Sequence, residues 1–112
     1  MENKFINRYH SFCHSLANLK KSTVADPQAD FVLEGTVQNY NLTFDLSWKI
    51  MKDILVKYMG ILDFAVGSPR EVLQTAFSNG IIESDMWLEM LRARNQLAHD
   101  YDAVSYTHLR AH

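Results

Sequence analysis

Hydrophobic residues recur along the first part of this chain at alternating intervals of four and three, which is the spacing of one face of an α-helix. The stripe comprises Phe5, Tyr9, Phe12, Leu16 and Leu19. Two lysines and two hydroxyl residues follow at positions 20–23, and cations are favourable near the C-terminal end of a helix. The pattern therefore predicts a first amphipathic helix that ends within this polar run.

A longer stripe predicts a second helix. Asp26 is a suitable N-cap and Pro27 suits the first helical position, so the helix is expected to begin there and to run to about Met59. Its main apolar face comprises Leu33, Val37, Tyr40, Phe44, Trp48, Met51, Leu55 and Tyr58. A second apolar line widens that face and comprises Leu46, Ile50 and Ile54. So wide a face needs packing partners on more than one side, and we expect some of them to come from another copy of the chain.

Two further helices are indicated by their end signals. Ser68, Pro69 and Glu71 form a capping box with proline at the first helical position, and Asn79-Gly80 is typical of a helix end. Ser84-Asp85 then opens a last helix. The expected apolar positions are Val72, Leu73, Ala76 and Phe77 in the first, and Met86, Trp87, Met90, Leu91 and Leu97 in the second. Because no segment has the convincing pattern of a strand, the predicted fold class is a compact all-α bundle.

Composition narrows the class of protein further. A chain of 112 residues with 47% hydrophobic and 21% charged residues has the composition of one ordinary globular domain. Its single cysteine excludes a disulfide framework and a four-ligand zinc finger, and it indicates a reducing compartment. The net charge of −2 argues against bulk electrostatic binding of nucleic acid. No signal peptide or membrane-spanning run is recognisable, so we expect a cytoplasmic protein that does not associate with membranes.

The candidate chemistry lies in the last patterned segment, LEMLRARNQLAHDYD. Arg94 and His99 are the residue types that metal-independent phosphodiester cleavage requires, because histidine transfers protons near neutral pH and arginine stabilises a phosphorus-centred transition state. Asn95 lies four residues before His99, on the same helical face, where it can orient the imidazole by a hydrogen bond. From residue types alone, the alternative is a solvated helix C-terminus with a histidine near the negative end of the helix dipole.

The spacing of these residues restricts how they can act together. Arg94 and His99 are five residues apart, which is about 140° around a regular helix. They can bind one phosphate only if the helix bends or ends near Ala98, or if a second chain completes the site. Tyr101 comes two residues after His99 and shares its side only where the backbone is extended. Arg92 is a candidate for a phosphate contact or for a salt bridge with Glu89.

The remaining polar and aromatic positions have a structural interpretation first. His10, Cys13 and His14 lie close in sequence, but no second ligand cluster has suitable spacing, so we expect exposed helix residues and no metal site. Trp48 and Trp87 lie in apolar stripes and are expected to anchor the core or a dimer interface. The scattered carboxylates are interpreted as a solvated face, with a surface for a basic partner as the alternative: Asp26, Asp30, Glu34, Asp45, Asp53 and Asp63.

Three blocks of the sequence, in this order, resemble the nucleotidyltransferase substrate-binding protein family, the helical partners of minimal nucleotidyltransferases within the HEPN superfamily. The blocks are FVLEGTVQNYNLTFDLSWKIMKDIL, SPREVLQTAFSNGII and WLEMLRARNQLAHDYD. They contain Trp48, the SPRE cap and the RNxxxH motif, and the similarity extends from about Phe5 to Asp102. The resemblance implies an antiparallel up-down helical bundle that forms a homodimer and brings two R-x4-H motifs into one cleft.

In active members of that superfamily, the cleft is a metal-independent endoribonuclease site. Carried over to this chain, Arg94 would stabilise the phosphate, and Asn95 would be the polar residue after the arginine. His99 would act as general base or acid while the ribose 2′-hydroxyl attacks the adjacent phosphate. The resemblance implies RNA as the substrate, with no role for DNA.

The family resemblance also implies regulation and an alternative function. In related toxin–antitoxin pairs, the nucleotidyltransferase partner adenylylates the tyrosine of an extended R-x4-H-x-Y motif, which is Tyr101 here. ATP and magnesium would enter only through that partner, and no cofactor or metal of the chain's own is expected. The alternative is a non-catalytic subunit that binds a substrate and presents it to the nucleotidyltransferase.

The end of the sequence departs from this family. Members continue after the H-x-Y-D block with another amphipathic helix, which the string VSYTHLRAH does not supply. That string resembles translated library-adapter sequence. We therefore expect a helical domain over residues 1–103 that lacks its C-terminal helix, and a non-native tail over residues 104–112.

Overall fold

The computed structural model describes the backbone of residues 2–61 and 67–111 and the side chains of residues 4–61 and 67–99. The described α-helices are α1 (Glu2–Ser22), α2 (Val32–Asp53), α3 (Pro69–Ser78) and α4 (Met86–Ala111). A π-helical turn, η1 (Ile54–Tyr58), continues α2 without a break. All regular secondary structure in these described ranges is helical, which confirms the predicted all-α fold class.

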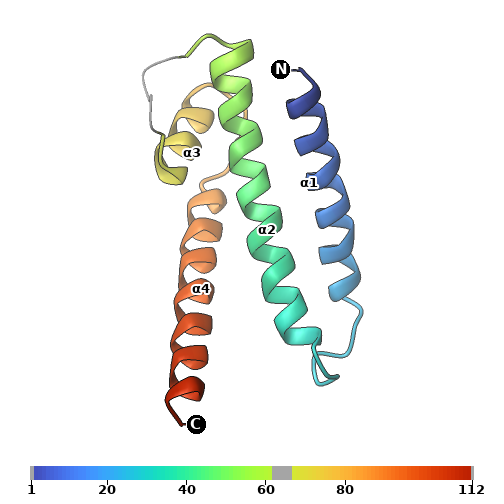
Figure 1. The fold of residues 1–112 in the computed structure, drawn as a ribbon. Coiled ribbons are helices and arrows are strands. Elements are labelled where there is room, and N and C mark those ends of the chain that lie inside the picture. The colour runs from blue at the N-terminus through green and yellow to red at the C-terminus, as the bar shows by residue number, and fades with distance from the viewer. Residues whose placement is uncertain (1, 62–66, 112) are drawn as a thin grey trace.

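The long helix α2 lies at the centre of the molecule (Figure 1). α1 packs along one side of α2 and runs antiparallel to it, whereas α3 and α4 pack on the other side. α4 also runs antiparallel to α2, so the three long helices alternate in direction, as in an up-down bundle. Within the described residues, no helix is both long enough and apolar enough to cross a lipid bilayer.

Polar contacts join α1 to α2. The hydroxyls of Ser15 and Thr43 share a hydrogen bond inside the interface, where both residues are buried. Nearer the other end of the pair, Arg8 of α1 forms an ion pair with Asp53 of α2. The predicted first helix is thus confirmed, and its contacts with α2 include polar side chains as well as the apolar stripe.

The start of α2 differs from the prediction, which placed it at Asp26-Pro27. A carboxylate oxygen of Asp26 accepts a hydrogen bond from the backbone N–H of Gln28 at 2.9 Å, and the N–H of Ala29 donates to the Asp26 carbonyl at 3.0 Å. These bonds close a local turn, because an aspartate side chain can satisfy nearby N–H groups without a helix. Phe31 then adopts a left-handed conformation with φ 68°, and α2 begins at the next residue. The predicted start of this helix is therefore wrong.

The second helix ends in π geometry. The N–H of Met59 donates to the carbonyl of Ile54, five residues earlier, at 3.0 Å. The chain leaves this turn through Gly60, which has φ 67°. The ring of Tyr58 meets the ring of Phe5 of α1 edge to face, with centroids 5.5 Å apart. The predicted end near Met59 is confirmed, whereas the π turn has no signal in the hydrophobic pattern.

Both predicted ends of α3 and the predicted start of α4 are also confirmed. The Ser68 side chain accepts a hydrogen bond from the N–H of Glu71 at 3.2 Å, as a capping residue does. Gly80, with φ 77°, follows the end of α3. At the start of α4, the N–H of Met86 donates to the hydroxyl of Ser84 at 3.0 Å.

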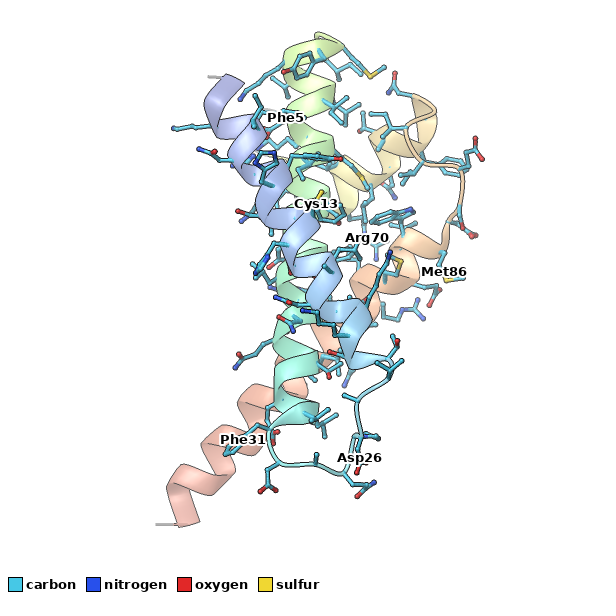
Figure 2. The ribbon with its side chains drawn as sticks, turned by 90° about the vertical axis from the view of Figure 1, so that its right-hand side faces the viewer. Phe5, Cys13, Asp26, Phe31, Arg70 and Met86 are labelled. Carbon is cyan, nitrogen blue, oxygen red and sulfur yellow. The ribbon has the colours of Figure 1, made fainter. Side chains whose placement is uncertain are left out.

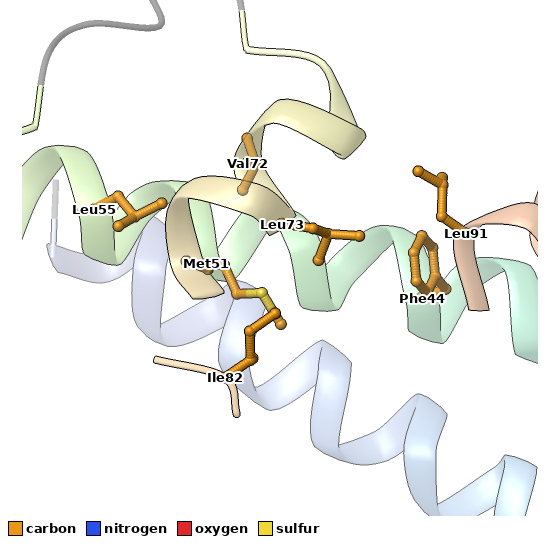
Figure 3. Close-up of a cluster of buried hydrophobic side chains, with 8 residues drawn as sticks. Phe44, Met51, Leu55, Val72, Leu73, Ile82 and Leu91 are labelled. Carbon is orange, nitrogen blue, oxygen red and sulfur yellow. The ribbon is translucent and has the colours of Figure 1, made fainter. Parts of the chain in front are cut away.

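A hydrophobic core lies between α2, α3 and α4 (Figure 3). Trp48 and Trp87 pack against it, which supports the prediction that they anchor the core. The stripes also predict burial of Leu33 and Phe77, but these side chains are 61% and 50% exposed. The buried core residues are Phe44, Met51, Leu55, Val72, Leu73, Ala76, Ile82 and Leu91.

Candidate functional site

α4 carries the residues of the predicted site. Its helix runs from Met86 to Ala111 and is not interrupted near Ala98. Arg94 and His99 therefore occupy regular helix positions about 140° apart. The helix does not end near Ala98. One chain therefore cannot direct both side chains to one phosphate in the way that such an end would allow.

Arg94 is bound by a carboxylate of the central helix. Its Nε donates to Oδ1 of Asp45 at 3.1 Å, and its Nη2 donates to Oδ2 at 2.9 Å. The side chains of Arg94 and Asp45 remain 29% and 30% exposed. The hydrogen bonds to Asp45 raise the pKa of Arg94 above its ordinary value, so the guanidinium is firmly charged. The interpretation as a solvated face is therefore wrong for Asp45, and also for Asp53, which pairs with Arg8; Asp63 lies outside the described residues.

Asn95 and His99 are both exposed on α4. Because they are four residues apart on a regular helix, they lie on one face, as predicted. Arg94 instead reaches α2 through its contact with Asp45. The structure thus places Asn95 and His99 together and separates Arg94 from them within one chain.

Tyr101 belongs to the backbone of α4, but its side chain lies outside the described residues. Residues 99 and 101 would share one side of the chain only if the backbone were extended, and α4 is helical at both positions. Two positions separated by two residues differ by about 200° around a regular helix. Within one chain, these two positions therefore lie on different sides of α4.

A second polar contact joins α4 to α2 one turn before Arg94. The hydroxyl of Tyr40 donates to the carbonyl of Met90 at 2.7 Å. Burial raises the pKa of Tyr40 above its ordinary value, so the hydroxyl remains a donor at neutral pH. The ring stacks on Phe44, with centroids 6.4 Å apart. The apolar stripe predicts burial of Tyr40, but it contains no signal for this hydrogen bond.

Arg92 lies on the solvent side of α4. Its Nη1 is 3.9 Å from Oε2 of Glu89, and the two side chains are 79% and 64% exposed. Of the two roles predicted for Arg92, the structure therefore contains the salt bridge with Glu89. So exposed a pair contributes little to stability.

Two cavities in the described part of the molecule are notable, and neither of these two is lined by Arg94, Asn95 or His99. A groove of about 300 Å³ lies between α1, α2 and α4, and its lining is almost wholly apolar. A cavity of about 270 Å³ lies between α3 and the start of α4. The groove is lined by residues that include Phe12, Leu16, Tyr40, Phe44, Trp87 and Met90, and the second cavity by residues that include Leu73, Gln74, Phe77, Ser84, Asp85 and Trp87.

The histidines and the cysteine of α1 are exposed, as the sequence predicts. Figure 2 shows Cys13 partway along α1, and His10 and His14 belong to the same turns. In the part of the chain that the structure describes, no group of three or more His, Cys, Asp or Glu side chains is arranged to hold a metal ion.

These features define a small all-α bundle protein whose candidate functional residues lie on one long helix, α4. Residues 7–109 match the family described as nucleotidyltransferase substrate binding protein like, and the chain belongs to this family. That description implies a nucleotidyltransferase as the partner of its members. Among curated proteins, no sequence matches the chain.

Proposed function

We propose that the chain is a nucleotidyltransferase partner of the HEPN type that cleaves RNA without a metal ion, using a composite site in a homodimer. The observation that carries this proposal is the arrangement of Arg94. Its charged guanidinium is held by Asp45 at 2.9 and 3.1 Å and remains 29% exposed. Asn95 and His99 lie within two turns of it on the same helix. A fixed cation and an exposed imidazole are the two groups that metal-independent phosphodiester cleavage needs, and in one chain they lie on different sides of α4.

The proposed reaction uses the imidazole and the guanidinium in separate roles. The neutral imidazole of His99 removes the proton from a ribose 2′-hydroxyl, and the 2′-oxygen attacks the adjacent phosphorus. The bond from phosphorus to the next 5′-oxygen breaks, and that oxygen takes a proton from the imidazolium of His99, which returns to its starting state. Arg94 stabilises the negative charge that develops on the non-bridging oxygens. The products are a cyclic phosphate on one fragment and a 5′-hydroxyl on the other.

A homodimer brings the two roles together. Because Arg94 and His99 are about 140° apart on α4, one copy supplies the guanidinium and the other supplies the imidazole to a given phosphate. Asn95 orients the imidazole from the same face of the helix. The net charge of −2 per chain keeps RNA binding local to this cleft.

The ribonuclease is tested with RNA in EDTA, comparing wild type with His99→Ala. A matched control is His14→Ala, because His14 is also an exposed histidine on a helix. Wild type and His14→Ala are expected to cleave, and His99→Ala is expected to be inactive. Equal cleavage by wild type and His99→Ala would rule out the proposed site.

Tyr101 is the proposed point of control by the nucleotidyltransferase. Its phenolic oxygen attacks the α-phosphorus of ATP, pyrophosphate leaves with magnesium, and the phenolic proton is released. Positions 99 and 101 lie on different sides of α4 within one chain, so in the proposed homodimer the AMP would bring bulk and negative charge into the composite cleft next to His99 of the other copy and repel RNA phosphates. Mass spectrometry is expected to find one AMP on wild type after incubation with the partner, ATP and magnesium. Equally strong labelling of Tyr101→Phe would contradict this assignment.

The second candidate function is a non-catalytic subunit that binds a substrate and presents it to the nucleotidyltransferase. The cavity of about 270 Å³ favours it, because polar Gln74 and Asp85 lie there beside aromatic Phe77. A folded wild type that cleaves no RNA would support this function. Phe77→Ala would then lower the activity of the nucleotidyltransferase complex, whereas Phe31→Ala, an exposed aromatic outside the cavity, would not.

A further inference from the structure

We propose that Asp45 is a positioning residue for Arg94: it binds one edge of the guanidinium and leaves the other edge for a single RNA phosphate. The inference rests on the proposed ribonuclease function. It assigns a role to a residue of α2, outside the helix that carries the motif.

The atoms in the contact determine which edge remains available. A guanidinium has five N–H donors, and Asp45 accepts from Nε and from Nη2. These two atoms form the side edge of the group. Nη1 and the second hydrogen of Nη2 form the end edge, which can donate two parallel bonds to phosphate oxygens. Arg94 is 29% exposed, so its side chain is not enclosed by the protein.

The position of Asp45 is itself rigid. The preceding residue, Phe44, is 3% exposed in the hydrophobic core, which fixes this turn of α2. On α4, the bond from Tyr40 to the carbonyl of Met90 fixes the turn before Arg94. Since both helices are fixed beside the ion pair, the guanidinium is held in one orientation before RNA binds. A preorganised donor avoids the cost of ordering during the reaction.

Asp45 also limits where Arg94 attracts nucleic acid. A carboxylate in direct contact cancels most of the field of the guanidinium at a distance, while the end edge still donates at contact range. Arg94 therefore selects a phosphate that reaches the site and contributes little to nonspecific RNA binding. A weak long-range attraction for RNA at Arg94 agrees with the net charge of −2, which also gives no bulk attraction for nucleic acid.

A second ion pair supplies a matched control. Asp53 also lies on α2 and binds an arginine of a neighbouring helix, Arg8 of α1. Its side chain is 15% exposed against 30% for Asp45, so its replacement removes a more buried carboxylate from an ion pair with an arginine of similar exposure. Asp53→Asn thus changes charge and stability without touching α4.

The kinetic test compares Asp45→Ala, Asp45→Glu and Asp53→Asn in RNA cleavage, with melting temperature measured for each variant. Asp45→Ala is expected to lower kcat by about 10- to 100-fold, because the guanidinium loses its orientation. KM is expected to stay constant or fall, because a negative charge is removed. Asp45→Glu restores part of kcat, and Asp53→Asn stays within about twofold of wild type. Unchanged kcat in Asp45→Ala, or an equal loss in Asp53→Asn, would overturn the inference.

A binding test separates this inference from the ribonuclease itself. The probe is a short RNA with 2′-O-methyl groups, which cannot form the cyclic product, and the readout is NMR of the Arg94 side chain. At saturation, the Nη resonances are expected to shift while the Nε–H resonance keeps its Asp45-bonded position. A shifted Nε–H resonance would mean that RNA displaces Asp45. Arg94 resonances that keep their positions at saturation would mean that no phosphate binds the guanidinium. Either result overturns the inference. The expected shifts in a protein that cleaves no RNA would support Asp45 while refuting the ribonuclease.

Discussion

The ion pair between Asp45 and Arg94 is expected to stabilise the fold as well as to orient the arginine. Exposed ion pairs contribute about 0.2–1 kcal/mol, and hydrogen bonds to charged groups contribute about 1.5–3 kcal/mol. This pair makes two such hydrogen bonds, but its side chains are 29% and 30% exposed, so solvent screens it in part. We therefore expect a coupling free energy of about 1–2 kcal/mol between the two side chains.

A double-mutant cycle measures this coupling. The free energy of unfolding in urea is determined for wild type, Asp45→Ala, Arg94→Ala and the double variant at low ionic strength. The double variant is expected to lose less stability than the sum of the single variants, because each single variant leaves an unpaired charge near the helix contact. High salt is expected to reduce the coupling, because the pair is partly exposed.

The same cycle on Arg8 and Asp53 checks that the method detects an ion pair of α2 on its other side. Losses for Asp45 and Arg94 that are additive within about 0.3–0.5 kcal/mol would refute the assigned coupling. Such a result would mean that the two side chains do not hold each other in solution. The proposed role of Asp45 in orienting Arg94 would then lose its structural basis.

Three further predictions concern the bundle. Leu55→Ala is expected to lower the free energy of unfolding by about 2–5 kcal/mol, because Leu55 is 0% exposed; a loss below about 1 kcal/mol in urea unfolding would contradict this. Burial raises the pKa of Tyr40 in the folded state above its unfolded value of about 10, so its contribution to stability is present below that pH and is lost as pH rises through the folded pKa. In Tyr40→Phe, the free energy of unfolding is therefore expected to fall less between about pH 8 and 11 than in wild type. At lower pH the variant is expected to be less stable than wild type, because it lacks the hydrogen bond to the Met90 carbonyl. Phe31→Gly is expected to stabilise the fold by about 0.5–1 kcal/mol, since φ 68° is unfavourable for phenylalanine and the ring is 83% exposed; a lower melting temperature would contradict this.

The helices could be predicted where the signals are local. The cap formed by Ser68 and Glu71 involves residues three apart, so the sequence contains both partners and their spacing. The start of α2 could not be predicted in the same way. Asp26 can cap a helix or close a turn with Gln28, and the sequence contains the acceptor without showing which N–H it binds.

The candidate site was predictable in its motif and not in its contacts. The face shared by Asn95 and His99 follows from helix geometry alone. Asp45 and Arg94 are 49 residues apart in sequence, and their contact depends on how α2 packs against α4. One signal was present: Asp45 directly follows Phe44 beside an apolar face, where a carboxylate needs a cationic partner when the bundle closes.

The position of α1 has a consequence for how the protein opens. Among the described residues, neither the buried hydrophobic core nor the side chains packed against it include any residue of α1. α1 is instead held by the hydrogen bond between Ser15 and Thr43, the ion pair between Arg8 and Asp53, and apolar side chains outside that core, so we expect it to open at lower free energy than α2 and α3. In native-state hydrogen exchange, the amides of α1 are expected to lose protection while those of α2 and α3 keep it. Each such opening would expose the α2 and α4 side of the apolar groove of about 300 Å³, so α1 would control access to an apolar surface outside the core.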